Sequence, residues 1–247
     1  MIFNISVDSR VGCVRENNED MVLVGEHFVR DGKLHVQVDL AEKDRYLIAL
    51  ADGMGGHNSG EVASSDVLHN IQFYYGDIPS GLAPGDLNES FCEWLESMNN
   101  TLDAKGRVDL ELKNMGTTFV SLAYYEKEFY WLNCGDSRLY RLRDGKLGQV
   151  TTDHSLSNMM GTTAHSNVIT NCIGGGCKTS FLDMVQYTEN VQPGDVFVLC
   201  SDGLNDMISD ADIESILLSG KNASALCDAA IEAGGYDNVS VVVIRVE

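Results

Sequence analysis

Short apolar runs, rich in valine, isoleucine, phenylalanine and tyrosine, recur along the whole sequence and constrain its fold more than any other feature. Runs of this length and composition predict β-strands. Asp31-Gly32 and Asp144-Gly145 predict turns between strands, and the second should close a hairpin that joins LYRLR to KLGQV. We therefore expect a strand-rich protein with antiparallel neighbours. The runs read IFNISV, MVLV, LHVQV, YLIALA, TTFVSLAYY, FYWLN, LYRLR, DVFVLC and VSVVVIRV.

Helical patterns form two groups, one in each half of the chain. In the first half, GEVASSDVLHNIQFYY is compatible with a helix, and a later stretch carries one apolar face behind Asp86 and Glu89, which are placed like a capping box. In the second half, a short stripe around Ile213 and the segment SALCDAAIEA predict two more helices. This order predicts an α+β fold with sheets in the middle and helices outside. The apolar face consists of Leu87, Phe91, Trp94, Leu95, Met98 and Leu102.

The composition is that of a folded globule. With 247 residues, 44% of them hydrophobic, and no internal repeat or Pro/Ser-rich linker, we expect one domain over residues 1–247. The formal net charge of -20 would repel phosphate backbones and anionic lipids, so we expect neither nucleic acid nor membrane as a partner. No apolar run approaches the roughly 18 residues of a membrane span.

The N-terminal residues and the cysteines favour the cytoplasm. The start, MIFNISVDSR, has neither the basic head nor the apolar core of a signal peptide. Seven cysteines are an odd number, and no CxxC pair is present, which predicts reduced thiols. We expect a monomeric, cytoplasmic protein.

Four predicted strands each carry an aspartate at one end. YLIALA leads into Asp52-Gly53, DVFVLC into Asp202-Gly203 and FYWLNC into Asp136, while Asp237 directly precedes VSVVVIRV. A single Asp-Gly is more often an ordinary turn. Four such ends can meet at one rim of two packed sheets, where their repulsion must be relieved by protonation or by a cation. An all-oxygen set favours Mg²⁺ or Mn²⁺, and a carbonyl such as that of Gly53 could join it.

A second polar group lies in VGCVRENNEDMVLV near the N-terminus. Arg15 offers a planar fork suited to phosphate, and Glu19 and Asp20 come just before a strand. A solvated loop is the alternative. The GGGCKTS segment fails the P-loop pattern because Cys177 stands where glycine is needed, and no GxSxG elbow is present. His57 is a candidate metal ligand or general acid, although a single loop histidine more often has neither role.

Taken together, these motifs resemble the metal-dependent Ser/Thr protein phosphatases of the type 2C (PPM) family, in particular its bacterial members. They follow the order of the family and span nearly the whole chain. The resemblance implies a four-layer α-β-β-α sandwich of two antiparallel sheets flanked by helices. The motifs are RENNED at Arg15, LADGMGGHNSGEVAS at Leu50, NMGTTFV at Asn114, NCGDSRLY at Asn133, TTDHSL at Thr151, LCSDGLNDMISD at Leu199 and GGYDNVSVVV at Gly234.

The resemblance also implies a role for each acid. Asp52 would bridge two Mn²⁺ or Mg²⁺ ions, with the Gly53 carbonyl and the Asp20 region serving one of them and Asp202 with Asp237 the other. Glu19 would act through a water molecule, and Asp136, with Asp202 and Asp206, matches the positions of a third, weaker metal. Arg15 matches the arginine that binds the substrate phosphate.

The implied reaction is hydrolysis of phosphoserine and phosphothreonine in proteins, reversing a cognate Ser/Thr kinase. A water or hydroxide that bridges the two ions would attack phosphorus in line. Met54 stands where some relatives carry a histidine, so His57 and a metal-bound water are both candidates for the general acid. The segment between Ser155 and Asn167, a flap in bacterial relatives, looks short.

Two other classes of function stay open. A pseudophosphatase would keep the fold to bind phosphoproteins, but its signature, a lost metal acid, is not seen. A hydrolase of small phosphate esters would suit a short flap. The acidic segment 39–44, which looks like an additional hairpin, is either a docking surface or, as we favour, a solvated turn.

Overall fold

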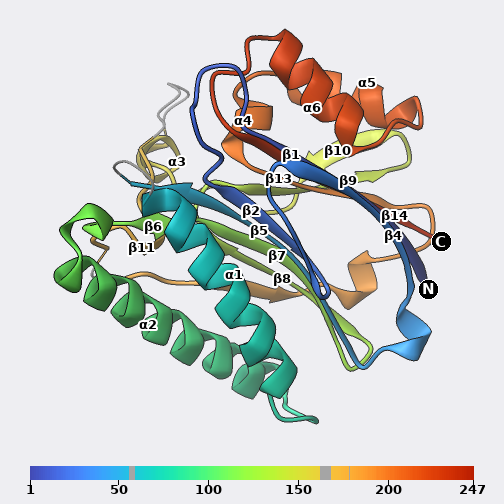
Figure 1. Ribbon diagram of the computed structural model, residues 1–247. Helices are drawn as coiled ribbons and strands as arrows, with labels where there is room; N and C mark the ends of the chain where they lie inside the picture. Colours follow the sequence, from blue (N-terminus) through green and yellow to red (C-terminus); the bar gives the residue numbers. More distant parts are fainter. Residues whose placement is uncertain (56–58, 162–167, 178) are drawn as a thin grey trace.

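Two antiparallel sheets form the centre of the computed structural model, which describes residues 1–55, 59–161, 168–177 and 179–247 (Figure 1). The first sheet has the order β10-β9-β13-β14-β1-β4, and the second has the order β11-β6-β5-β7-β8-β12, with β2 paired to β5 and β3 to β2. The first contains β1 (Ile2–Arg10), β4 (Gly32–Asp39), β9 (Arg138–Arg143), β10 (Lys146–Gln149), β13 (Val196–Cys200) and β14 (Val239–Val246). The second contains β2 (Asp20–Val24), β3 (His27–Val29), β5 (Arg45–Met54), β6 (Gly116–Thr117), β7 (Phe119–Tyr125), β8 (Glu128–Cys134), β11 (Ile173–Gly174) and β12 (Asp183–Gln186).

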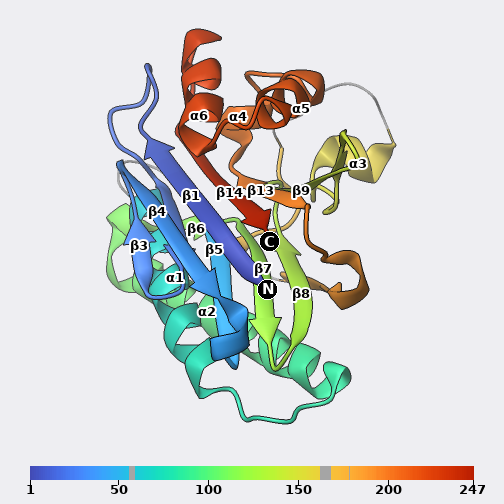
Figure 2. The ribbon, with the colours of Figure 1, turned by 90° about the vertical axis from the view of Figure 1, so that its right-hand side faces the viewer.

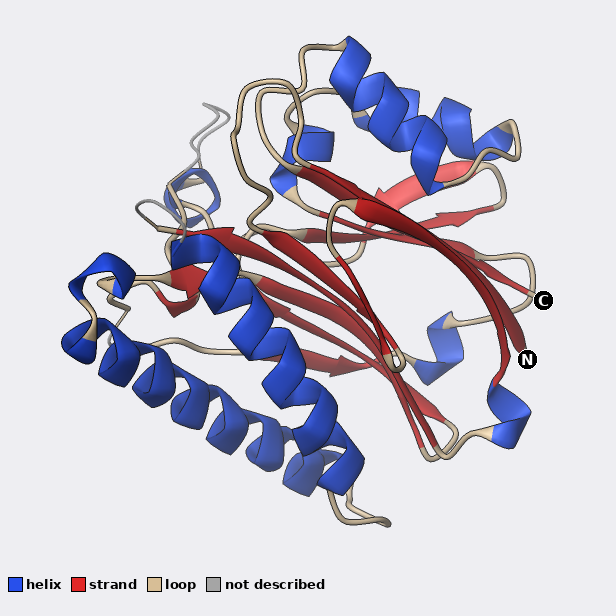
Figure 3. Cartoon of the chain, viewed as in Figure 1, coloured by secondary structure: helices blue, strands red, loops and turns tan. Residues whose placement is uncertain are grey.

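Helices cover the outer face of each sheet, so the molecule has four layers (Figures 1 and 2). Two long helices lie against the second sheet, and two shorter ones lie against the first, as the blue helices on either side of the red strands show (Figure 3). The α+β sandwich expected from the sequence is confirmed. The helices are α1 (Ser59–Asp77), α2 (Pro84–Val108), α3 (Leu156–Met160), α4 (Asp202–Asn205), α5 (Asp210–Leu218) and α6 (Ala223–Glu232), with short 3-10 turns η1 (Leu40–Glu42), η2 (Leu110–Leu112) and η3 (Thr188–Asn190).

Strand β5 is apolar from Leu47 to Ala51 because both of its faces are buried there. Leu47 and Ala49 pack with α1 and α2 on the outer side, whereas Ile48 and Leu50 pack against the first sheet on the inner side. Successive side chains of a strand point to opposite faces, so a strand between two apolar layers needs an unbroken apolar run. The same logic applies to β14, where Val242 faces the other sheet and its neighbours face α5 and α6.

Two local predictions need correction. Helix α2 begins at Pro84 after Ala83, which makes no side-chain cap bond, so Asp86 and Glu89 form no capping box. Proline suits this first position because its missing N–H would have no helical partner there. Segment 39–44 is no hairpin, because η1 carries the chain from β4 in one sheet to β5 in the other.

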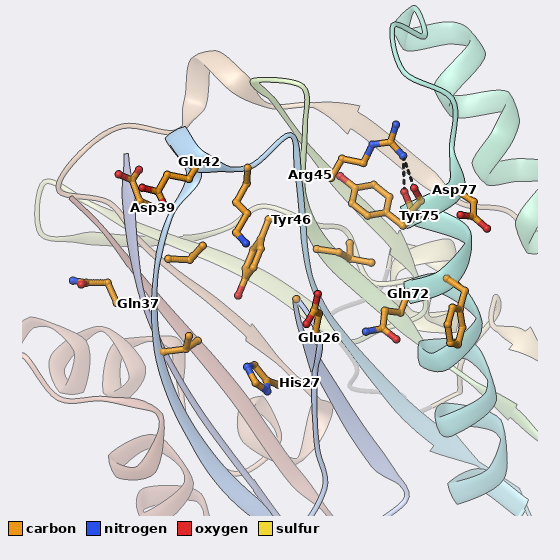
Figure 4. A pocket seen from close by; sticks show the side chains of 17 residues that line it. Glu26, His27, Gln37, Asp39, Glu42, Arg45, Tyr46, Gln72, Tyr75 and Asp77 are labelled. Carbon is orange, nitrogen blue, oxygen red and sulfur yellow. Dashed lines mark hydrogen bonds between the residues drawn. The ribbon is translucent and has the colours of Figure 1, made fainter.

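A cleft of about 840 Å³ opens at the end of β5 that is remote from Asp52 (Figure 4). Arg45 borders it and donates hydrogen bonds to the carbonyls of Tyr75 and Gly76, at 3.0 Å each, which tie the start of β5 to the end of α1. The described residues that line it include none of the aspartates predicted to bind metal. Within the described part of the chain, no helix combines the length and apolarity that crossing a bilayer requires.

Candidate metal centre

The predicted acids come from both sheets and meet at one rim of the sandwich. Asp52 lies near the end of β5, and Asp20, the first residue of β2, is its direct partner across the antiparallel pair. Asp136 lies in the turn between β8 and β9, Asp202 begins α4 directly after β13, and Asp237 precedes β14. Five separate segments therefore bring carboxylates to the same rim.

The carboxylates lie close enough to resist ionisation. Burial raises the pKa of Asp52 well above its ordinary value, and the charges of the other four acids raise it further. Burial followed by the charge of Asp136 does the same to the pKa of Asp202. The pKa of Asp20 rises to about 6, mainly through burial, although hydrogen bonds to its carboxylate oppose this rise. A buried like-charge cluster of this kind favours either protons or a cation.

Two buried oxygens in this group have no hydrogen-bond partner. They are Asp20 Oδ1 and Glu19 Oε1. The other oxygen of Asp20 accepts a hydrogen bond of 2.7 Å from the Ser201 hydroxyl. Buried carboxylate oxygens without donors are costly unless a cation satisfies them, so the residues present fit a hard divalent ion.

The acids are near one another but are not yet arranged around an ion. In residues 1–55, 59–161, 168–177 and 179–247, no three histidine, cysteine, aspartate or glutamate side chains already surround a single binding point. Asp237 is drawn aside by Arg15, whose Nη2 lies 2.7 Å from Asp237 Oδ2.

Gly53 allows a close approach that any side chain would prevent. A Cβ atom here would lie 2.1 Å from the carbonyl oxygen of Gly60 and 2.7 Å from that of Glu19. Strand β5 does not end at Asp52-Gly53 but continues to Met54, since Gly53 and Met54 pair with β6. The glycine is thus needed because α1 and the segment before β2 both press against the strand.

Two threonines hold the backbone of Asp52 in place. Thr118 Oγ1 accepts a hydrogen bond of 3.0 Å from the Asp52 N–H, and Thr117 Oγ1 donates one of 2.8 Å to the Asp52 carbonyl. Thr118 also contacts the Ser137 hydroxyl at 2.7 Å. Ser201 and Asn238 support the acids together with the two threonines. The side-chain oxygen of Asn238 accepts a hydrogen bond of 2.9 Å from the Glu19 N–H. We predicted no role for these four residues from the sequence, although all four lie within the quoted motifs NMGTTFV, LCSDGLNDMISD and GGYDNVSVVV.

The remaining predicted residues are placed as follows. Arg15 is half exposed beside Asp237 and is paired with that acid rather than free. Asp206 lies one helical turn beyond Asp202, and its backbone N–H donates to the Asp202 carbonyl at 2.8 Å. Its charge contributes to raising the pKa of Asp136, which burial chiefly lifts to about 6. His57 lies outside the described residues.

Comparison with known proteins agrees with this arrangement of fold and acids. A family model described as Protein phosphatase 2C matches residues 31–228. This chain belongs to the protein phosphatase 2C family. It is 31% identical to the Serine/threonine protein phosphatase PstP of Mycobacterium tuberculosis over 256 residues, which cover 100% of this chain and 45% of PstP. The chain therefore spans about half the length of that relative.

A second relative and two solved structures are covered over 96% or more of their own chains. Protein phosphatase PhpP of Streptococcus pneumoniae is 31% identical, with 97% of this chain and 96% of PhpP covered. The crystal structure of the Mycobacterium tuberculosis phosphatase PstP/Ppp superposes with a TM-score of 0.78 over 100% of both chains, at 31% identity. The PstP catalytic domain in complex with 2 manganese ions has a TM-score of 0.74 at 31% identity and covers 99% of this chain and 98% of that one.

Proposed function

We propose that this protein is a metal-dependent phosphatase that hydrolyses phosphoserine and phosphothreonine in proteins. The observation that carries the proposal is the buried carboxylate group around Asp52, with two oxygens that lack any donor. Family membership and the manganese ions of the PstP catalytic domain support it.

Each acid has a role in this proposal. Asp52, whose pKa the charges of the other four acids raise, would be shared by two ions, Mn²⁺ or Mg²⁺. The Gly53 carbonyl, Asp20 and, through water, Glu19 would hold one ion, and Asp202 with Asp237 the other. When bound, such a pair of cations supplies a strongly polarised water as nucleophile near neutral pH.

The side chains of this protein account for orientation and charge. Arg15 can exchange Asp237 for a substrate phosphate, because both present oxygens to the same planar fork. Thr117 and Thr118 fix the backbone of Asp52, so the acid stays in place while its charge environment changes. The protein carries a formal charge of -20, so Arg15 and the bound cations are needed to attract a phosphorylated substrate. His57 and a metal-bound water both remain candidates for the general acid.

The proposal is tested with p-nitrophenyl phosphate and a phosphothreonine peptide in the presence of Mn²⁺. We expect hydrolysis that EDTA abolishes and that Asp202→Ala removes. Asp86→Ala, which deletes an exposed carboxylate on α2, is the matched control and should retain activity. Turnover that survives both EDTA and Asp202→Ala would reject the proposal.

The same assay separates the alternatives. Hydrolysis of the small ester without the phosphopeptide would indicate a small-ester hydrolase. Binding of a phosphoprotein without Mn²⁺ binding or turnover would indicate a pseudophosphatase.

We further propose a cellular role that follows from the reaction. The substrates would be phosphoproteins in the cytoplasm, and the enzyme would act as a single-domain monomer that opposes a Ser/Thr kinase. All seven cysteines are free thiols, which is consistent with a reducing compartment.

A further inference from the structure

His154 is a buried histidine that no step of the proposed reaction uses, yet both polar groups of the Gly135 backbone are directed to it. The Gly135 N–H donates to His154 Nδ1 at 3.1 Å, and the His154 N–H donates to the Gly135 carbonyl at 2.9 Å. Its ring packs on Phe181, with centroids 4.6 Å apart. Gly135 directly precedes Asp136, so His154 holds the turn that carries this acid.

The contacts of the ring define its tautomer. A backbone N–H can only donate, so Nδ1 must be an acceptor. Asn171 donates a second hydrogen bond to Nδ1 at 2.8 Å, because its own oxygen already accepts from the Phe181 N–H at 3.1 Å. The proton therefore sits on Nε2, which lies 2.9 Å from Asp183 Oδ2. Asp183 on β12 thus fixes the ring orientation that Gly135 requires.

The held turn leads directly to the metal acids. Gly135 has φ +125°, and a Cβ atom on it would lie 2.7 Å from Thr118. The Ser137 hydroxyl, on the other side of Asp136, contacts Thr118 Oγ1, which in turn accepts from the Asp52 N–H. Asp136 is therefore clamped on both sides, by His154 through Gly135 and by Thr118 through Ser137.

The backbone of His154 also anchors the segment that follows. Its carbonyl accepts a hydrogen bond of 2.8 Å from the Thr170 N–H, and the adjacent Ser155 forms a β-bridge with Ile169. One buried residue thus connects the base of this segment to the Asp136 turn.

We propose that His154 is a positioning residue which, held by Asp183, fixes the Gly135 turn so that Asp136 can hold a third, weaker divalent cation beside Asp202. This inference rests on the proposed function, since that function supplies the two tighter ions. This positioning role depends on His154 Nδ1, because that atom accepts the hydrogen bond from the Gly135 N–H.

Two substitutions at position 154 separate the two ring nitrogens. His154→Asn places an amide oxygen near the position of Nδ1 and can still accept from the Gly135 N–H. His154→Gln places its amide near Nε2, so it can reach Asp183 but leaves the Gly135 N–H without an acceptor. His35→Gln, on the exposed face of β4, is the matched control.

The probe is Mn²⁺ alone, titrated into the full chain and followed by calorimetry and by the electron paramagnetic resonance signal of free Mn²⁺. We expect His154→Gln to weaken the third class of site by about tenfold or more, as outer contacts of metal sites do, and to leave the two tighter sites unchanged. His154→Asn and His35→Gln should keep the wild-type affinity. Asp136→Asn should cause the same loss, and its combination with His154→Gln should add nothing further.

Three results would overturn the inference: a wild-type protein with no third Mn²⁺ site, equal losses in His154→Asn and His154→Gln, or additive losses in the double variant. The two tighter sites report on the proposed function separately. Their absence, together with the absence of p-nitrophenyl phosphate hydrolysis in the wild-type protein, would instead reject that function.

Discussion

Asp52 and Gly53 are adjacent residues of β5 with different roles: the first supplies a buried carboxylate, and the second lets other backbone segments approach the strand. The Asp52 carboxylate is buried among other acids, which raises its pKa and makes a cation or a proton favourable. Gly53 has no side chain, and the backbone of Glu19 and Gly60 can therefore approach it. The charge of Asp52 and the absence of a side chain at Gly53 can each be tested by a separate substitution.

Gly53→Ala should destabilise the protein. Its Cβ would lie 2.1 Å from the Gly60 carbonyl oxygen, so α1 or β5 must shift. We expect a loss of about 1–3 kcal/mol in the free energy of unfolding, measured by urea denaturation. Gly148→Ala on β10 is the control, because a Cβ there has no atom within 4 Å. Equal stability of the two variants would show that the close approach at Gly53 is not tight.

Arg15→Ala should affect substrate more than metal. The guanidinium now pairs with Asp237, so its removal frees that carboxylate and should not weaken Mn²⁺ binding. The KM for a phosphothreonine peptide should rise by about 10- to 150-fold, the equivalent of one lost charged hydrogen bond of about 1.5–3 kcal/mol. Arg107→Ala, which removes an exposed arginine of α2, should leave the KM unchanged. An unchanged KM in Arg15→Ala would remove this residue from the phosphate site.

At the scale of elements, the spacing of apolar residues in the sequence correctly predicted which residues of α2 are buried. All six apolar residues expected on one face of α2 are buried, because a 3.6-residue repeat can only be satisfied by one packing surface. Short strands such as β3 and β12 were not predicted, since their few residues are partly exposed and their pairing depends on distant partners. The acids were proposed as site residues because they flank apolar runs, whereas Thr118 and His154 act through tertiary contacts that no local sequence pattern predicts.

Trp94→Ala should reveal how strongly α2 is anchored to the second sheet. Trp94 is fully buried against Phe119, and its indole N–H donates to Asn70 on α1 at 2.9 Å. We expect a loss of about 3–5 kcal/mol, measured by thermal or urea unfolding. Phe73 on α1 is 71% exposed, so Phe73→Ala should change stability by less than about 0.5 kcal/mol. A small effect of Trp94→Ala would contradict the packing of these layers.

At the scale of the whole molecule, a charge of -20 and a buried acidic cluster make stability depend on pH and on metal. The folded-state pKa of Asp20 and that of Asp136 are each raised to about 6, mainly by burial, from an ordinary value of 3.8. The folded state therefore holds more protons than the unfolded state between these values, and its stability falls as the pH rises through them.

The metal-free protein in EDTA should thus lose thermal stability between about pH 4 and pH 6, the interval between the ordinary and the raised pKa values. Mn²⁺ binds the ionised acids, so the rise in Tm that it causes should be larger at pH 7.5 than at pH 5. Differential scanning fluorimetry at both values measures this difference, with Asp52→Asn as the variant in which the Mn²⁺ effect should shrink. An increase in Tm that is independent of pH would contradict a cluster of carboxylates as the binding site.

The most direct measurement is the number of Mn²⁺ ions that the wild-type chain binds tightly, counted by electron paramagnetic resonance and compared with Asp52→Asn. Two tightly bound ions in the wild type, with tight binding lost in the variant, are the predicted result. Fewer than two such ions in the wild type, or an unchanged count in Asp52→Asn, would contradict the proposed centre.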